Sequence, residues 1–171
     1  MTLIWSSIVA MLTLILWQSA IMKLVQAERY DSAASHLIPI AALRGMPVTI
    51  IVAFVELAIG IILLVSRLAQ VAAITGVLLF LGYAALLLAA LARGDNNFDC
   101  GCSLVARAVP INGWTIYRPL LLAAMSALAV LLAPSSGQFA LQGMLPGLAF
   151  YAFYLAANEI DGLKTYRKDV S

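Results

Sequence analysis

Five long apolar runs constrain what this chain can fold into more than any other feature of its sequence. A bilayer core about 30 Å thick is crossed by about 20 helical residues, and most of the runs approach that length. Hydrophobic residues make up 64% of the chain and charged residues only 11%, whereas soluble domains carry about 25% charged residues. We therefore expect one integral membrane domain, 1–171. Its expected spans cover residues 3–22, 46–66, 68–92, 114–133 and 139–158.

The ends of the runs carry further signals. Lys23 follows the first run, where its long side chain is expected to reach the membrane interface. No basic stretch or good cleavage site accompanies that run, so we expect a retained span and not a removed signal peptide. Pro146 predicts a kink in the fifth run. Gly143 and Gly147, four residues apart, allow close helix packing, either between two chains or within one.

The composition also excludes several classes of function. The net charge of +2 gives no reason to expect a nucleic-acid partner. His36 is the single histidine, and the two cysteines supply only half of the ligands of a closed zinc site. We therefore expect membrane lipid around the chain and no metal.

The two cysteines, Cys100 and Cys102, lie one residue apart in the polar segment 93–117, which connects the third and fourth expected spans. In an extended chain their Cα atoms would be about 7 Å apart, just beyond disulfide range. Gly101 permits the bend that a disulfide would need. Strain in so small a ring would raise the reduction potential, which favours disulfide exchange over a structural role. Two unpaired thiols without a role remain the alternative.

Glu56 lies near the middle of the second expected span. An ionisable group at that depth is costly, so it is normally partnered or functional. One interpretation is a structural hydrogen bond to Tyr83, Gln18 or Ser19 on neighbouring helices, or a neutral acid packed in the bundle. The other is a polar candidate for binding a cofactor or a small molecule. Gly60, one turn later on the same face, would leave room for a neighbour or a ligand.

Four short segments share a pattern with a known family. They read LWQSAIMKL over 16–24, VELAIG over 55–60, LARG over 91–94 and DCGC over 99–102. Together they resemble the MauE family of methylamine utilisation membrane proteins, over about residues 14–133. The DCGC sequence following Arg-Gly is the most specific of them. The resemblance implies an all-α transmembrane four-helix bundle of the DoxX or VKOR kind, to which the fifth apolar run, 139–158, would add a C-terminal transmembrane helix.

The resemblance also implies a function. MauE proteins look like membrane partners of MauD, a thioredoxin-like protein, in maturing the small subunit of methylamine dehydrogenase, which carries tryptophan tryptophylquinone and many disulfides. On this chain Cys100 and Cys102 would be the redox pair, whereas Glu56, Lys23 and Arg93 match the pattern without an assigned step. A membrane quinone is the candidate electron acceptor by analogy with DsbB and VKOR, and the reverse electron flow fits the cysteines equally well. The alternatives are a non-catalytic scaffold for that partner and a small-molecule or quinone-binding, transporter-like protein.

The distribution of basic residues and the implied function predict opposite orientations of the protein in the membrane. Five spans place nine basic residues on the side that carries the cysteines and only Arg67 on the other. The positive-inside rule would put the cysteines in the cytoplasm, whereas disulfides of a periplasmic enzyme form on the other side. We expect a multi-pass protein of the bacterial inner membrane with its cysteines at the periplasmic face. The nine residues are Lys23, Arg29, Arg44, Arg93, Arg107, Arg118, Lys164, Arg167 and Lys168.

Overall fold

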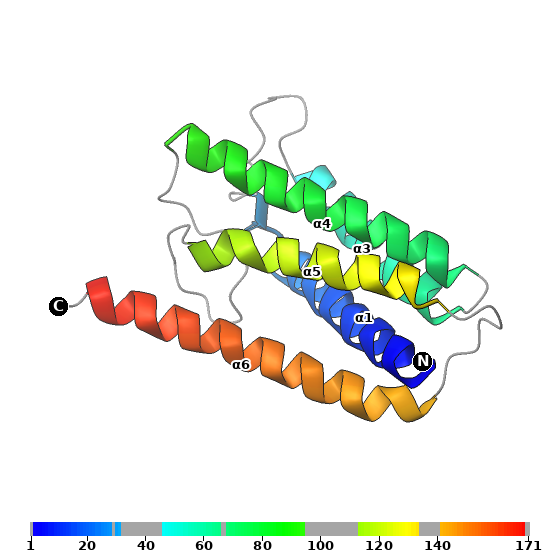
Figure 1. The fold of residues 1–171 in the computed structure, drawn as a ribbon. Helices are drawn as coiled ribbons and strands as arrows, with labels where there is room; N and C mark the ends of the chain where they lie inside the picture. The colour runs from blue at the N-terminus through cyan, green and yellow to red at the C-terminus, as the bar shows by residue number, and fades with distance from the viewer. Residues whose placement is uncertain are drawn as a thin grey trace.

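The structure is a computed structural model that describes residues 2–28, 30–31, 46–65, 68–94, 113–133 and 141–169, which are helical apart from short turns and contain no strand (Figure 1). This confirms the predicted all-α class. The helices begin and end within a few residues of the expected spans, except that the last one continues well beyond residue 158. They are α1 (Thr2–Val25), α3 (Met46–Leu64), α4 (Ala69–Ala92), α5 (Gly113–Leu131), the short 3-10 helix η2 (Leu141–Gly143) and α6 (Met144–Asp169).

Three helices in the described part of the chain, α1, α4 and α5, are long and apolar enough to cross a membrane. Helix α3 contains a shorter apolar stretch, Val48–Leu64. Its 19 residues rise about 28 Å at 1.5 Å each. Helix α6 starts with apolar residues but becomes polar toward its end. The protein is thus a membrane protein with three candidate spans, and membrane crossing by α3 and α6 stays a prediction.

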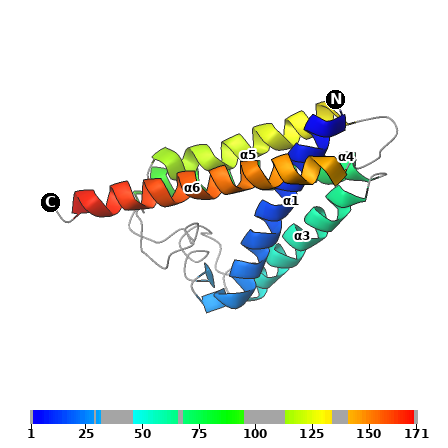
Figure 2. The ribbon, with the colours of Figure 1, turned by 90° about the horizontal axis from the view of Figure 1, so that it is seen from below.

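The packing of the helices brings distant parts of the chain together. Helix α1 contacts α3, α5 and α6, and α4 contacts α3 and α5. Four helices, α1, α3, α4 and α5, therefore form a closed ring of neighbours, with α6 lying outside it against α1 (Figure 1). Figure 2 shows α1 and α3 inclined relative to α5 and α6. Helix α4 ends, and α5 begins, at the end of the bundle opposite the N-terminus. We call this the cysteine end, because segment 95–112 connects these two helices.

Helix α1 supplies much of the core. Trp5, Leu12 and Leu16 are among its fully buried side chains. The Trp5 indole N–H donates a 3.1 Å hydrogen bond to the Ala129 carbonyl of α5, which satisfies the polar atom of a buried aromatic residue. By contrast, α3 exposes a stripe of large apolar side chains, as expected for a helix that faces lipid. That stripe consists of Ile51, Phe54, Val55 and Ile61.

Two glycines fit the start of α6 closely against α1. Gly143 packs on Ser6, and a Cβ atom added to Gly147 would lie 2.6 Å from the Ala10 Cβ and 2.8 Å from the Ser7 carbonyl oxygen. Of the two interpretations of the Gly143 and Gly147 spacing, the structure shows packing within one chain.

The prediction of a kink at Pro146 is wrong. The chain changes from the 3-10 helix η2 to the α-helix at Met144, so Pro146 lies in the first turn of α6. A proline is tolerated there because the first turn has no backbone acceptor for its missing N–H. Pro119 is the proline that lies inside a helix, α5.

The close contact of α6 with α1 predicts that Gly147→Ala destabilises the protein by about 1 to 3 kcal/mol, the usual cost of overpacking. The matched control is Gly82→Ala in α4, where the added Cβ meets no described atom within 4 Å and where alanine favours the helix by up to about 1 kcal/mol. Thermal unfolding of both variants in the same detergent measures the difference. Equal midpoints for the two variants would show that Gly147 is not closely packed.

Candidate functional site

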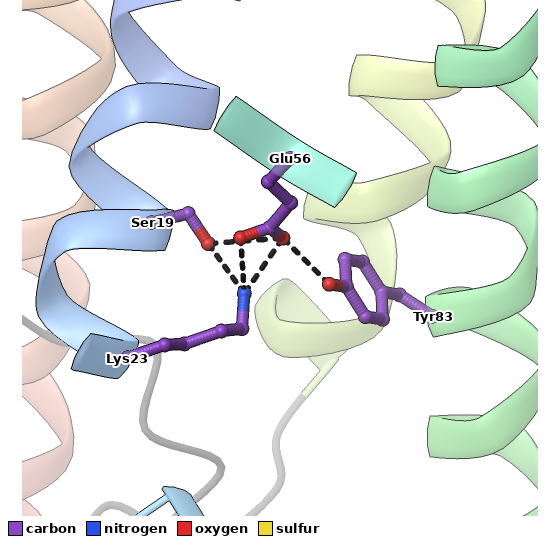
Figure 3. A network of polar contacts seen from close by, with 4 residues as sticks. All are labelled: Ser19, Lys23, Glu56 and Tyr83. Atoms are coloured by element: carbon purple, nitrogen blue, oxygen red, sulfur yellow. Dashed lines mark hydrogen bonds and ion pairs between the residues drawn. The ribbon is translucent and has the colours of Figure 1, made fainter. Parts of the chain in front are cut away.

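A buried ion pair lies between α1 and α3 (Figure 3). The Lys23 Nζ atom lies 2.6 Å from Glu56 Oε1 and 2.7 Å from Oε2. The side chain of Glu56 is 1% exposed and that of Lys23 is 11% exposed. Removing an ion from water costs several kcal/mol, so a carboxylate this deeply buried needs a counter-charge and further hydrogen bonds. Lys23 supplies the counter-charge.

Two neutral side chains complete the hydrogen bonds of this pair (Figure 3). The Tyr83 hydroxyl of α4 donates to Glu56 Oε1 at 2.5 Å, and the Ser19 hydroxyl of α1 donates to the same oxygen at 3.2 Å. Ser19 and Lys23 lie four residues apart on α1 and therefore share one face of that helix. We call these four residues the Glu56 network: Ser19, Lys23, Glu56 and Tyr83. The network connects α1, α3 and α4.

The network confirms part of the prediction for Glu56. Tyr83 and Ser19 are hydrogen-bonded to it as expected, whereas the side-chain oxygen of Gln18 instead accepts a 2.8 Å hydrogen bond from the Tyr151 hydroxyl of α6. The expected placement of Lys23 at the membrane interface is wrong, because its ammonium group points into the bundle toward Glu56. In the sequence, the signals that could have predicted this ion pair were the charge of Lys23 and its position one turn after Ser19.

Aromatic rings lie close to the Lys23 ammonium group as well. Its Nζ atom is 5.2 Å from the centre of the Tyr83 ring and 5.8 Å from that of Tyr30. Both distances fall within the range of about 6 Å over which a cation is attracted to a ring face. The positive charge is thus balanced by a carboxylate and by two rings.

The space beside Glu56 is occupied by protein. A Cβ atom on Gly60 would lie 2.5 Å from Trp17 Nε1, so the glycine admits the Trp17 ring of α1, in agreement with the predicted room for a neighbour. The Thr13 hydroxyl donates to the Gly60 carbonyl at 3.4 Å. Because both Glu56 oxygens are already engaged, we assign no quinone contact to this residue.

A second polar cluster connects α5 with α6. The Arg118 guanidinium donates to the Tyr154 hydroxyl and lies 4.9 Å from the centre of its ring. One turn earlier on α5, the Trp114 indole N–H donates to the Asn158 side-chain oxygen at 3.2 Å. These contacts hold the N-terminal part of α5, at the cysteine end, against α6.

The predicted redox residues, Cys100 and Cys102, lie outside the described residues, but the helix ends that flank them are described. Arg93 caps the C-terminus of α4, its N–H bonding to the carbonyls of Ala89 and Ala90 at 3.2 and 3.1 Å. Gly94 follows at φ +76°, a conformation that suits glycine and that commonly ends helices. The Arg-Gly pair before the cysteines therefore has a structural role in ending α4. The described residues contain no cluster of His, Cys, Asp and Glu side chains that could hold a metal.

Comparisons with known proteins add a family to this geometry. The family model described as methylamine utilisation protein MauE matches residues 1–133, which include both cysteines and the whole Glu56 network but not α6. A curated relative, the methylamine utilization protein MauE of Paracoccus denitrificans, is 29% identical over 157 residues. That alignment covers 89% of this chain and 84% of the relative. No solved structure matches the chain.

The buried ion pair predicts strong coupling between its two members. Lys23→Met or Glu56→Met alone leaves one charge unpaired in the bundle, and we expect each to cost about 3 to 5 kcal/mol. The double variant removes both charges and should lose far less than the sum of the single losses. Unfolding by denaturant in detergent measures all four proteins of the cycle. Additive losses would mean that the two side chains do not interact.

Proposed function

The chain belongs to the MauE family of methylamine utilisation proteins, and from that premise we propose that it is a membrane thiol–disulfide redox protein whose Cys100–Cys102 pair exchanges disulfides with a thioredoxin-like partner. The observation that carries the proposal is the sequence Asp99-Cys100-Gly101-Cys102, which holds the only two thiols of a predominantly apolar chain. The proposed context is the maturation of the small subunit of methylamine dehydrogenase by a MauD-like partner.

The proposed exchange proceeds through a mixed disulfide. A thiolate of the partner attacks one sulfur of the Cys100–Cys102 disulfide, whose S–S bond breaks as the new S–S bond forms. The second thiolate of the partner then attacks the mixed disulfide, and the partner leaves with a disulfide while both cysteines of this chain become thiols. Two electrons have moved to this chain. Regenerating its disulfide requires a two-electron acceptor, for which a membrane quinone is the candidate by chemical class.

The fold supports this proposal by fixing both attachments of the cysteine segment. Helix α4, which ends at Arg93 and Gly94, is joined to α3 through the hydrogen bond between Tyr83 and Glu56. Helix α5, which begins at Gly113, is held to α6 by the contacts of Arg118 and Trp114. The two helix ends that flank the redox segment in the sequence are thus anchored, and we propose that a soluble partner reaches the cysteines at this end of the bundle.

We propose further that this end faces the periplasm of a bacterial inner membrane, because that compartment permits disulfides. The structure removes one of the nine basic residues whose charges favour a cytoplasmic location for this end. Lys23 is neutralised by Glu56 within the bundle, so it is not among the charges that a connecting segment presents to the cytoplasm.

Trapping the mixed disulfide tests the redox role. Cys100→Ser and Cys102→Ser each leave one thiol, and we expect one of these variants to retain a thioredoxin-like protein through a bond that reductant breaks. Alkylation of intact cells, followed by purification and mass spectrometry, identifies what is attached. The variant with both serines is the control and should retain nothing. Normal maturation of methylamine dehydrogenase in cells that carry the double variant would refute the redox role and favour a scaffold.

Labelling of the cysteines in intact cells tests the orientation. After mild reduction, we expect a thiol reagent that cannot cross the inner membrane to modify Cys100 and Cys102. The control is Ser135→Cys in the protein that lacks both native cysteines, because residue 135 follows α5 in the sequence, and α5 begins at the cysteine end and is a candidate membrane span. It should react only after the membrane is opened. The reverse pattern would place the cysteines in the cytoplasm.

A further inference from the structure

The Glu56 network has the composition of a receptor for a primary ammonium ion. A primary ammonium group carries three N–H donors and no acceptor. In the structure, Lys23 Nζ has three acceptors, Glu56 Oε1 at 2.6 Å, Glu56 Oε2 at 2.7 Å and Ser19 Oγ at 2.7 Å. The number of acceptors thus equals the number of donors that a primary ammonium offers, whereas a quaternary ammonium would offer none.

Two aromatic rings further restrict which ions fit at the position of the Lys23 ammonium group. The rings of Tyr30 and Tyr83 lie 5.8 and 5.2 Å from Nζ, so they attract a compact cation. The hydroxyl of Tyr83 also donates to Glu56 at 2.5 Å, which fixes the ring and the carboxylate relative to each other. We call Ser19, Tyr30, Glu56 and Tyr83 the ammonium cage.

We infer that the ammonium cage is a binding site for primary alkylammonium ions, which Lys23 fills as a tethered ligand and which free methylammonium can fill in its place. The terminal carbon and ammonium group of Lys23 differ from methylammonium only in that the carbon is bonded to the rest of the side chain. Methylammonium is also the simplest cation with three N–H donors and one apolar group, and it is the protonated form of the amine in the family's name. The site uses neither cysteine and is independent of the proposed disulfide exchange.

The position of Lys23 shows how a free ion would compete with it. Lys23 lies in the last turn of α1, which ends at Val25, and its side chain is 11% exposed while that of Glu56 is 1% exposed. Lys23 is therefore the more exposed member of the pair, and a free ion would compete with its ammonium group for Glu56. A tethered ligand has an effective concentration on the order of millimolar or higher, so free methylammonium must reach a comparable concentration to displace it. Truncating Lys23 to alanine removes its competition with free methylammonium.

Thermal unfolding of purified Lys23→Ala in detergent tests the inference. We expect methylammonium chloride to raise its unfolding midpoint progressively with concentration, because a ligand that binds only the folded state stabilises it. Tetramethylammonium chloride at the same ionic strength should leave the midpoint unchanged. The matched control is Lys23→Ala combined with Glu56→Gln, which also lacks the lysine but removes the charge of the carboxylate that would receive the ammonium ion, and it should not respond. Equal responses to the two salts, or equal responses of Lys23→Ala and of the double variant, would overturn the inference.

A second measurement covers the case in which Lys23→Ala does not fold. The NMR signal of ¹³C-labelled methylammonium should broaden in the presence of the wild-type protein, and the broadening should be lost with Glu56→Gln, which keeps the shape of the side chain without its charge. Tetramethylammonium should not restore the sharp signal by competition, whereas n-butylammonium should. A signal that stays sharp with the wild-type protein at every methylammonium concentration would overturn the inference.

Discussion

The charge of Glu56 is the constraint on which the rest of this structure depends. It lies in the middle of an apolar helix, and its side chain is only 1% exposed, so water cannot solvate the carboxylate. The charge is tolerated because α1 brings Lys23 and Ser19 to it and α4 brings Tyr83. Apolar packing between helices in lipid is weakly directional, since lipid tails are as apolar as leucine. A directional polar network therefore determines how α1, α3 and α4 are positioned relative to one another.

The need to stabilise the Glu56 charge also affects the segment that contains Cys100 and Cys102, which we propose carries out disulfide exchange. Once α4 is fixed through Tyr83, its C-terminus at Arg93 and Gly94 has a defined place, from which the cysteine segment departs. The other attachment is fixed separately. Helix α5 is joined to α1 by the bond from Trp5 to the carbonyl of Ala129 and to α6 by Arg118. Both helices that flank the cysteine segment in the sequence are thus anchored by polar contacts with other helices.

Much of the helical architecture could be predicted from the sequence, because the length needed to cross a bilayer leaves a direct mark on hydropathy. Tyr83 and Ser19 were predictable partners of Glu56, since they are polar side chains within neighbouring apolar runs. The role of Lys23 was not predictable in the same way. A lysine just after an apolar run suits the interface equally well, and only the lateral placement of α1 against α3 decides between the two. The start of α6 at Met144 depends likewise on the packing of Gly143 and Gly147 against α1. The chemistry of Cys100 and Cys102 is inferred from their sequence pattern and from the family, because they lie outside the described residues.

The ionisation state of Glu56 tests the buried ion pair most directly. Infrared spectra of the protein with ¹³C-labelled glutamate, compared between wild type and Glu56→Gln, isolate the vibration of this one side chain. The bidentate contact with Lys23 predicts a band of an ionised carboxylate in the wild-type protein that is missing from the variant. A band of a protonated carboxyl group in its place would contradict the ion pair, and with it the explanation of how the three helices are held together.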